Sequence, residues 1–404
     1  MNRQSLSIVA LSGSFCMTVG FVLGYTYYRS LETTPTPQRE ASEETVMRRS
    51  GLEGEPLSPP RKVEELVASE PAEQPGEPRS SGAAPVEGAT DPEFDYEAFR
   101  DGLRDGNFEL PSLSVEEIEA ALEAAGRPSH SLVAAAQMVE DPELAEQYLE
   151  EALEKSPDSP AVLASAAAWF LGQEDPPDRL DDVLDHLREV DPTNSFGSYL
   201  AAARLSEAGE IDRALEMVKE AGTRTQFHSY VATTVDAAEQ LFLRSGYAPV
   251  LARSATVFGA RVDYLMPMRG LSESLVGHLD TLQGPGRDRE GLALLSRANR
   301  LGEHLSLGGR TMIDELIGMS VQAHALERER EIQVRLRDDA RVAWIDEHLE
   351  NNRLYKQEVQ RLAGQLPGLV AAMGEDELLT YFDRVMKSGE LVAIREYLAR
   401  QGGQ

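Results

Sequence analysis

Beyond residue 110, apolar residues recur every three to four positions, which is the spacing of one face of an α-helix. The first such stretch reads LSVEEIEAALEAAGR: Ser114 and Glu117 have the spacing of a helix N-terminal capping box, and Gly126 stands where the helix should end. No stretch keeps the alternation of a half-buried strand for more than a few residues. We therefore predict an all-α fold.

Helices are also predicted after residue 226, where glycine and proline separate apolar stretches. The last two of them are expected at 341–364 and 375–400, with QLPG (365–368) as a break. These helices are expected to form a C-terminal all-helical domain, an array or a bundle, over 226–404.

The N-terminus carries a run of 24 uncharged residues, 5–28, between Arg3 and Arg29. About 20 helical residues cross a hydrocarbon core, and tyrosines at the end of the run suit the interface. We predict an uncleaved transmembrane anchor over 1–30; a cleaved signal peptide or a buried soluble helix are the alternatives. The protein is then a single-pass membrane protein with its helical domain on the non-cytoplasmic side.

Small residues share one face of this anchor at four-residue spacing: Ser12, Cys16, Gly20 and Gly24. Such a face lets two membrane helices approach closely, so a homodimer is one interpretation. The other is that small residues are common in membrane helices. Cys16 is the single cysteine, so the rest of the chain forms no disulfide.

Residues 31–92 are rich in proline, glutamate and serine and have no sustained period. A segment of this composition buries too little apolar surface to offset the entropy of ordering. We predict an extended, disordered linker there, and a helical domain over 93–225.

Within 93–225 the chain resembles itself at a spacing of 35 and then 34 residues. Equivalent positions in successive second helices carry small or medium apolar residues: Ala145, Leu180 and Ala214; Leu149, Leu184 and Val218; Ala152, Leu187 and Ala221. A period near 34 built from two helices is typical of a repeat array, although ordinary helical hairpins produce it too.

The chain here resembles the tetratricopeptide repeat family, over about 126–225. The resemblance rests on the alanines that open second helices (Ala145, Ala214), a turn glycine (Gly209) and two closing prolines (Pro157, Pro192). It implies stacked helical hairpins whose first helices line a concave binding groove.

Carried over by alignment, the groove residues are Arg127, His130, Gln137, Ser165, Trp169, Gln173, Phe196, Tyr199 and Glu207. Large aromatic residues in a groove are the usual anchors of a protein interface. The alternative is that Trp169 and Tyr199 pack against helices of the C-terminal half.

Composition and motifs narrow the function. A net charge of −30 argues against binding nucleic acid. The seven histidines are scattered, and we find no nucleotide loop and no nucleophile elbow, so we predict no cofactor, no metal and no catalysis. The expected function is a membrane-anchored scaffold that binds a protein or peptide partner. The alternative is a cell-envelope enzyme with an unrecognised site in the helical domain.

Overall fold

The computed structural model describes residues 95–402 except 106–109, 174, 283 and 285. The regular elements in this part of the chain are helices, without a strand among them, which confirms the all-α prediction. The predicted anchor, its small-residue face and the linker lie outside the described residues. Among the helices described, none is long and apolar enough to cross a bilayer.

Local sequence sets several helix ends. The predicted capping box is present: the Ser114 hydroxyl accepts from the backbone N–H of Glu117 (3.2 Å), and the Glu117 carboxylate accepts from the backbone N–H of Ser114 (2.8 Å). Gly126 ends that helix with φ at 75°.

The helices are α3 (Tyr96–Asp105), α4 (Val115–Ala125), α5 (Ser129–Met138), α6 (Pro142–Lys155), α7 (Pro160–Leu171), α8 (Leu180–Val190), α9 (Phe196–Glu207), α10 (Ile211–Thr223), α11 (Val231–Arg244), α12 (Pro249–Phe258), α13 (Leu265–His278), the 3₁₀ turn η2 (Leu279–Thr281), α14 (Arg287–Gly308), α15 (Met312–Leu336), α16 (Asp339–Ala372), α17 (Glu375–Ser388) and α18 (Glu390–Gly402).

The predicted break at 365–368 is wrong, because α16 continues through Pro367. Proline cannot donate the helical hydrogen bond, but the extra turn buries Val370 and Ala371, each 1% exposed. The single helix predicted over 375–400 is instead two. Gly389 separates α17 from α18 with φ at 91°, a conformation that residues with a side chain rarely adopt.

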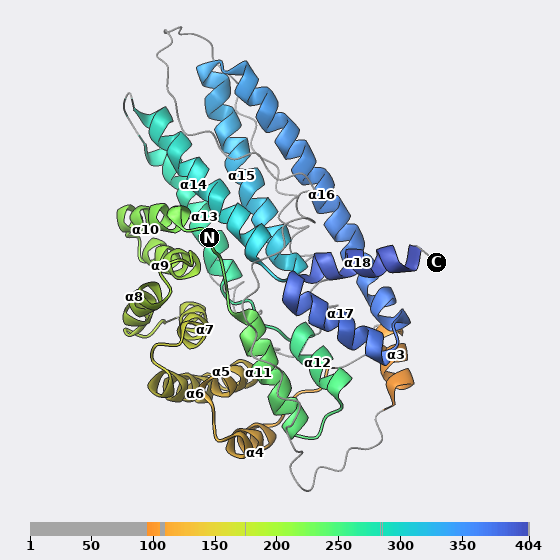
Figure 1. Ribbon diagram of the computed structural model, residues 1–404. Helices are drawn as coiled ribbons and strands as arrows, with labels where there is room; N and C mark the ends of the chain where they lie inside the picture. Colours follow the sequence, from red (N-terminus) through yellow and green to blue (C-terminus); the bar gives the residue numbers. More distant parts are fainter. Residues whose placement is uncertain (1–94, 106–109, 174, 283, 285, 403–404) are drawn as a thin grey trace, which may run out of the picture. The chain divides into compact units, whose positions relative to one another are not determined.

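Three hairpins, α5–α6, α7–α8 and α9–α10, follow one another in contact (Figure 1). The nine equivalent positions of their second helices, from Ala145 to Ala221, are all buried and at most 2% exposed. Burial of the same positions in each hairpin is what a repeated unit requires. Membership of the tetratricopeptide family stays a prediction.

Helices α11 and α13 cover the face that the first helices turn inward. Helix α11 contacts α4, α5 and α7, while α13 contacts α9. All residues from Ala161 to Leu171 of α7 are therefore buried. The main apolar cluster runs from Leu113 to Ile332 and continues across residue 225, where the sequence predicted a domain boundary.

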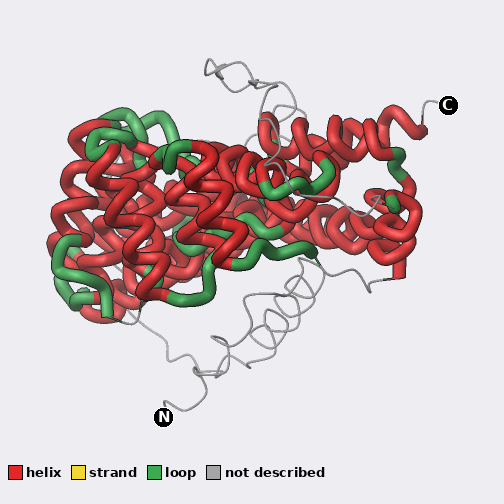
Figure 2. The backbone as a smooth tube through the Cα atoms, turned by 90° about the horizontal axis from the view of Figure 1, so that it is seen from below, coloured by secondary structure: helices red, strands yellow, loops and turns green. Residues whose placement is uncertain are grey.

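Helices α14, α15 and α16 lie side by side, and the α17–α18 hairpin packs on α12 and α16 (Figure 1). Helix α3 packs on α16, and the Tyr96 hydroxyl donates to the carbonyl of Met373 at 2.9 Å. Short loops join most of these helices (Figure 2). All described residues belong to one compact unit.

Candidate functional site

A small hollow lies on the inward face of the first helices. Its volume is about 20 Å³, enough for one small chemical group. It is bounded by α5, α7, α11 and the segment that leads into α13. The lining residues are Gln137, Ala164, Ser165, Ala168, Ser229, Val231, Thr234, Arg261, Asp263 and Tyr264.

Helix α7 contributes three small residues to the hollow, Ala164, Ser165 and Ala168. Residues three and four apart lie on one face of a helix, and the two alanines leave space that a larger side chain would fill. The Ser165 hydroxyl lies 3.4 Å from the Thr234 hydroxyl of α11. Each hydroxyl can donate and accept a hydrogen bond, so the two give this side of the hollow hydrogen-bonding groups for a ligand.

The segment before α13 supplies a charged pair and a tyrosine. Arg261, whose side chain is 40% exposed, pairs through Nε with Asp263 at 3.1 Å. The buried Tyr264 hydroxyl donates to Oδ1 of Asp314 at 2.6 Å. Burial, together with the charge of Asp314, raises the pKa of Tyr264 well above its usual value. Tyr264 therefore lines the hollow as a neutral phenol whose hydroxyl donates a hydrogen bond to Asp314.

The Asp314 side chain accepts hydrogen bonds at the N-terminus of α15, where it forms a capping box with Thr311. Besides the bond from Tyr264, its other oxygen accepts from the backbone N–H of Arg310 (3.0 Å), the backbone N–H of Thr311 (2.9 Å) and the Thr311 hydroxyl (2.8 Å). Burial raises the pKa of Asp314, although these bonds favour its charged form. The carboxylate thus caps a helix, and the hollow itself offers hydroxyls, an amide and an ion pair.

Two of the groove residues predicted from the sequence meet in this hollow. Gln137 comes from α5 and Ser165 from α7, which are the first helices of successive hairpins. Gln137 is half-buried and Ser165 is 8% exposed.

The aromatic residues predicted for the groove are instead interior. Trp169 is 6% exposed, and Phe196 and Tyr199 are fully buried. The ring of Phe196 lies 5.2 Å from that of Tyr264, and the ring of Tyr199 lies 5.6 Å from that of His304. These three side chains therefore do not line an open trough, because α11, α13 and α14 supply the residues that cover the array.

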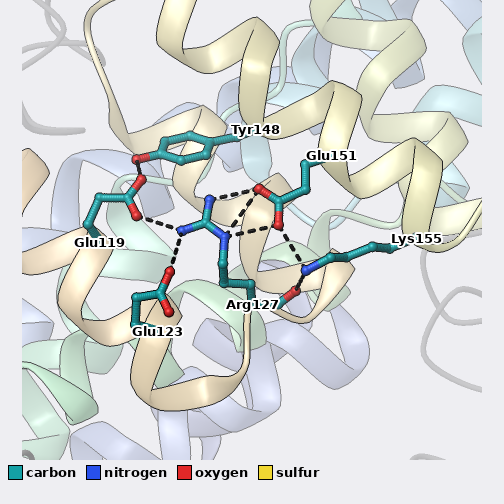
Figure 3. Close-up of polar contacts among 6 residues, drawn as sticks. All are labelled: Glu119, Glu123, Arg127, Tyr148, Glu151 and Lys155. Atoms are coloured by element: carbon teal, nitrogen blue, oxygen red, sulfur yellow. Dashed lines mark hydrogen bonds and ion pairs between the residues drawn. The ribbon is translucent and has the colours of Figure 1, made fainter.

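Arg127 lies at the far end of the array, where it joins α4 to α6 (Figure 3). Its guanidinium contacts Glu119 at 2.6 Å and Glu151 at 2.7 Å, and Glu123 at 3.4 Å. Lys155 donates to the Arg127 carbonyl at 2.8 Å. The hydrogen bond from Arg127 lowers the pKa of Glu151 to about 2, in spite of partial burial. This cluster fastens neighbouring helices.

The remaining predicted groove residues are not brought together. His130 and Glu207 are exposed, at the start of α5 and the end of α9. Gln173 donates from its side chain to the carbonyl of Trp169 at 3.1 Å, beyond the end of α7.

A serine and a histidine do meet elsewhere in the interior. The Ser195 hydroxyl lies 3.2 Å from Nδ1 of His304 and donates to the carbonyl of Gln226 at 2.8 Å. Burial lowers the pKa of His304 to about 4. Ser195 is fully buried, and its two contacts tie the α8–α9 loop to α14 through His304 and to the segment before α11 through Gln226. In the described part of the chain, no group of three or more metal-binding side chains converges.

Sequence reasoning missed Ser229, Thr234, Arg261, Asp263 and Tyr264. Thr234 belongs to a helix after the repeats, and the others belong to the irregular segments before α11 and α13. Periodicity carries no signal for such segments. They reach the first helices through tertiary contacts, those of α11 with α5 and α7 and that of α13 with α9.

Comparison with known proteins returned no matching family model, no matching curated protein and no matching solved structure.

Proposed function

We propose that the chain is a membrane-anchored helical scaffold that holds a protein or peptide partner and carries out no reaction of its own. The observation that carries the proposal is the hollow in which Gln137 of α5 and Ser165 of α7 meet Thr234 of α11. Successive hairpins thus contribute polar side chains to one recess on their inward face. The resembled family uses the same face for binding.

The accessible part of this site is its rim. Arg261 is exposed, and Gln137 and Asp263 are half-buried, whereas Ser165 and Thr234 lie deeper. We propose that a partner contacts the rim and extends one small polar group into the hollow, where it hydrogen-bonds to the Ser165 and Thr234 hydroxyls. Polar groups that converge on a recess fix orientation and specificity more than they add affinity.

The membrane attachment rests on the uncharged run at 5–28. We propose that it anchors the chain, that residues 31–92 form the linker, and that the helical unit lies on the non-cytoplasmic side. A homodimer through Ser12, Cys16, Gly20 and Gly24 also stays a proposal. A cell-envelope enzyme with an unrecognised site in the helical domain is the alternative that the sequence predicts.

Site-specific photo-cross-linking of the full chain in intact membranes tests the scaffold proposal. A photoreactive residue replaces Gln137 at the rim, and in a matched control it replaces Gln147, which is exposed on α6. We expect a discrete partner adduct at position 137 that position 147 does not give. Equal adducts at both positions, or none at 137, would contradict a partner at the hollow.

A blocking variant adds a second readout. Ala168→Val places two methyl groups toward the hollow, so the adduct at position 137 should fall several-fold. The melting temperature of the variant shows whether the fold has survived. An unchanged adduct in a folded Ala168→Val protein argues that the partner binds elsewhere.

A further inference from the structure

The turn between α17 and α18 is fastened to the loop between α14 and α15. The backbone N–H of Glu390 donates to the carbonyl of Arg310 at 2.8 Å, and the Arg310 guanidinium donates to the carbonyl of Lys387 at 2.8 Å. The Glu390 side chain reaches the first turn of α15, where its Oε2 accepts from the backbone N–H of Met312 at 2.9 Å. One glutamate therefore joins the beginnings of α15 and α18.

The carboxyl group of Glu390 has a setting that suits its neutral form. Its side chain is 7% exposed. Within the described residues, the bond from Met312 is the one it receives, whereas Asp314 nearby receives four. A buried carboxylate needs several donors to offset lost hydration, so ionisation of Glu390 is costly.

Three other titratable or charged groups surround Glu390. Asp314 of α15 opposes a second negative charge. Tyr381 of α17 is buried, its pKa is raised by burial and by the charge of Glu390, and its hydroxyl has no hydrogen-bond partner among the described residues. Arg310 of the α14–α15 loop directs its guanidinium to a carbonyl. Burial, with a smaller contribution from Asp314, raises the pKa of Glu390 to about 7.

Another acidic group of α15, Glu315, must be told apart from Glu390. Burial raises the pKa of Glu315 on α15 to about 7, against the lowering effect of Tyr355 of α16 and Arg395 of α18. Both carboxyl groups therefore titrate in the same range, and the test below includes each of them.

We propose that Glu390 is a pH-sensitive latch that holds the α17–α18 hairpin against α15 when protonated and loosens it when ionised. A neutral carboxyl group still accepts the Met312 N–H, whereas a charged one adds the cost of burial and the repulsion from Asp314. The docked state binds the proton more tightly than the undocked state, so docking is strongest below the ordinary glutamate pKa. It weakens by up to about tenfold per pH unit until the pH reaches the pKa of the docked form.

Hydrogen exchange on the full chain in detergent micelles tests the latch. After correction for intrinsic exchange rates, amide protection over 375–402 should fall by up to about 100-fold between pH 5 and pH 7. Protection over α7 and α8 in the same samples serves as the internal reference and should change little. Wild-type protection that is flat over 375–402, relative to this reference, would overturn the proposal without any variant.

Variants assign the effect to one side chain. Glu390→Gln keeps the acceptor for Met312 without the charge, so it should reduce the pH dependence to less than about threefold. Asp376→Asn, at an exposed position of α17, is the matched control and should behave as the wild type. The latch is also refuted if Glu390→Gln keeps the wild-type slope, or if Glu315→Gln alone removes it.

Discussion

Gly302 of α14 and Gly318 of α15 face each other where their helices cross. A Cβ atom added to Gly302 would lie 2.7 Å from the carbonyl oxygen of Gly318, and one added to Gly318 would lie 2.6 Å from the carbonyl oxygen of Gly302. The two backbones are therefore in direct contact, and neither position has room for a methyl group.

Alanine at either glycine should push the two helices apart. We expect Gly302→Ala and Gly318→Ala each to lower the free energy of unfolding by ~1–3 kcal/mol, as overpacking does. Urea denaturation measures the change. Gly364→Ala on α16, where an added Cβ meets nothing within 4 Å, is the control and should gain up to ~1 kcal/mol from helix propensity. Equal effects at all three positions would mean that the crossing is looser than described.

The Arg127 cluster predicts a loss of stability in acid. The folded-state pKa of Glu151 is about 2, below its usual value of 4.5. Its contribution is present above pH 4.5 and is lost as the pH falls from there toward 2. Because the side chain is partly solvated, we expect about 1 kcal/mol. Glu151→Gln should reduce the difference in unfolding free energy between pH 5 and pH 3 by about half of that amount, because the loss is complete only near pH 2, and Glu154→Gln, exposed on the same helix, should not.

Trp169 should behave as a core residue. Its side chain is 6% exposed, so Trp169→Ala leaves a cavity and should cost ~3–5 kcal/mol of stability. Thermal melting measures this loss. A melting temperature close to that of the wild type, together with loss of the partner adduct, would show that Trp169 lines an open groove and is not a core residue.

Tyr199 offers a finer test of the same interior. Its hydroxyl is buried without a hydrogen-bond partner in the described part of the chain, so its removal costs no hydrogen bond. We expect Tyr199→Phe to leave stability unchanged or raise it slightly, and Tyr199→Ala to cost ~3–5 kcal/mol. A clear loss for Tyr199→Phe would show that the hydroxyl has a partner such as a bound water.

The N-terminal run should hold the protein in the membrane. We expect the full chain to remain in the membrane fraction after an alkaline carbonate wash, and a chain that lacks residues 1–30 to be released, because the uncharged run is long enough to span a bilayer. Peptide mapping should recover the N-terminus. A mature end near residue 30 would identify a cleaved signal peptide instead.

Features set by neighbouring residues were predictable from the sequence. The Ser114–Glu117 capping box, the stop at Gly126 and the buried positions of the second helices follow from local spacing. The continuation of α16 through Pro367 was not predictable, because the gain comes from burial of Val370 and Ala371 by other helices.

The candidate site was predictable in part. Alignment of the hairpins pointed to Gln137 and Ser165, which do line the hollow. The same alignment could not tell that Trp169, Phe196 and Tyr199 are interior, since an apolar stripe fits a groove and a core equally well. The helix that decides between them, α11, begins only at Val231, beyond the repeats.

Helix α11 occupies the inward face of the array as a bound ligand would, but it is part of the same chain. Because it belongs to the same chain and lies against α4, α5 and α7, its effective concentration at that face is on the order of millimolar or higher. A free helix present at micromolar concentration therefore competes at a disadvantage of about a thousandfold, even with equal intrinsic affinity. A free helix therefore does not displace α11 from the inward face of the array. A partner gains most from contacts with the residues of that face that α11 leaves exposed.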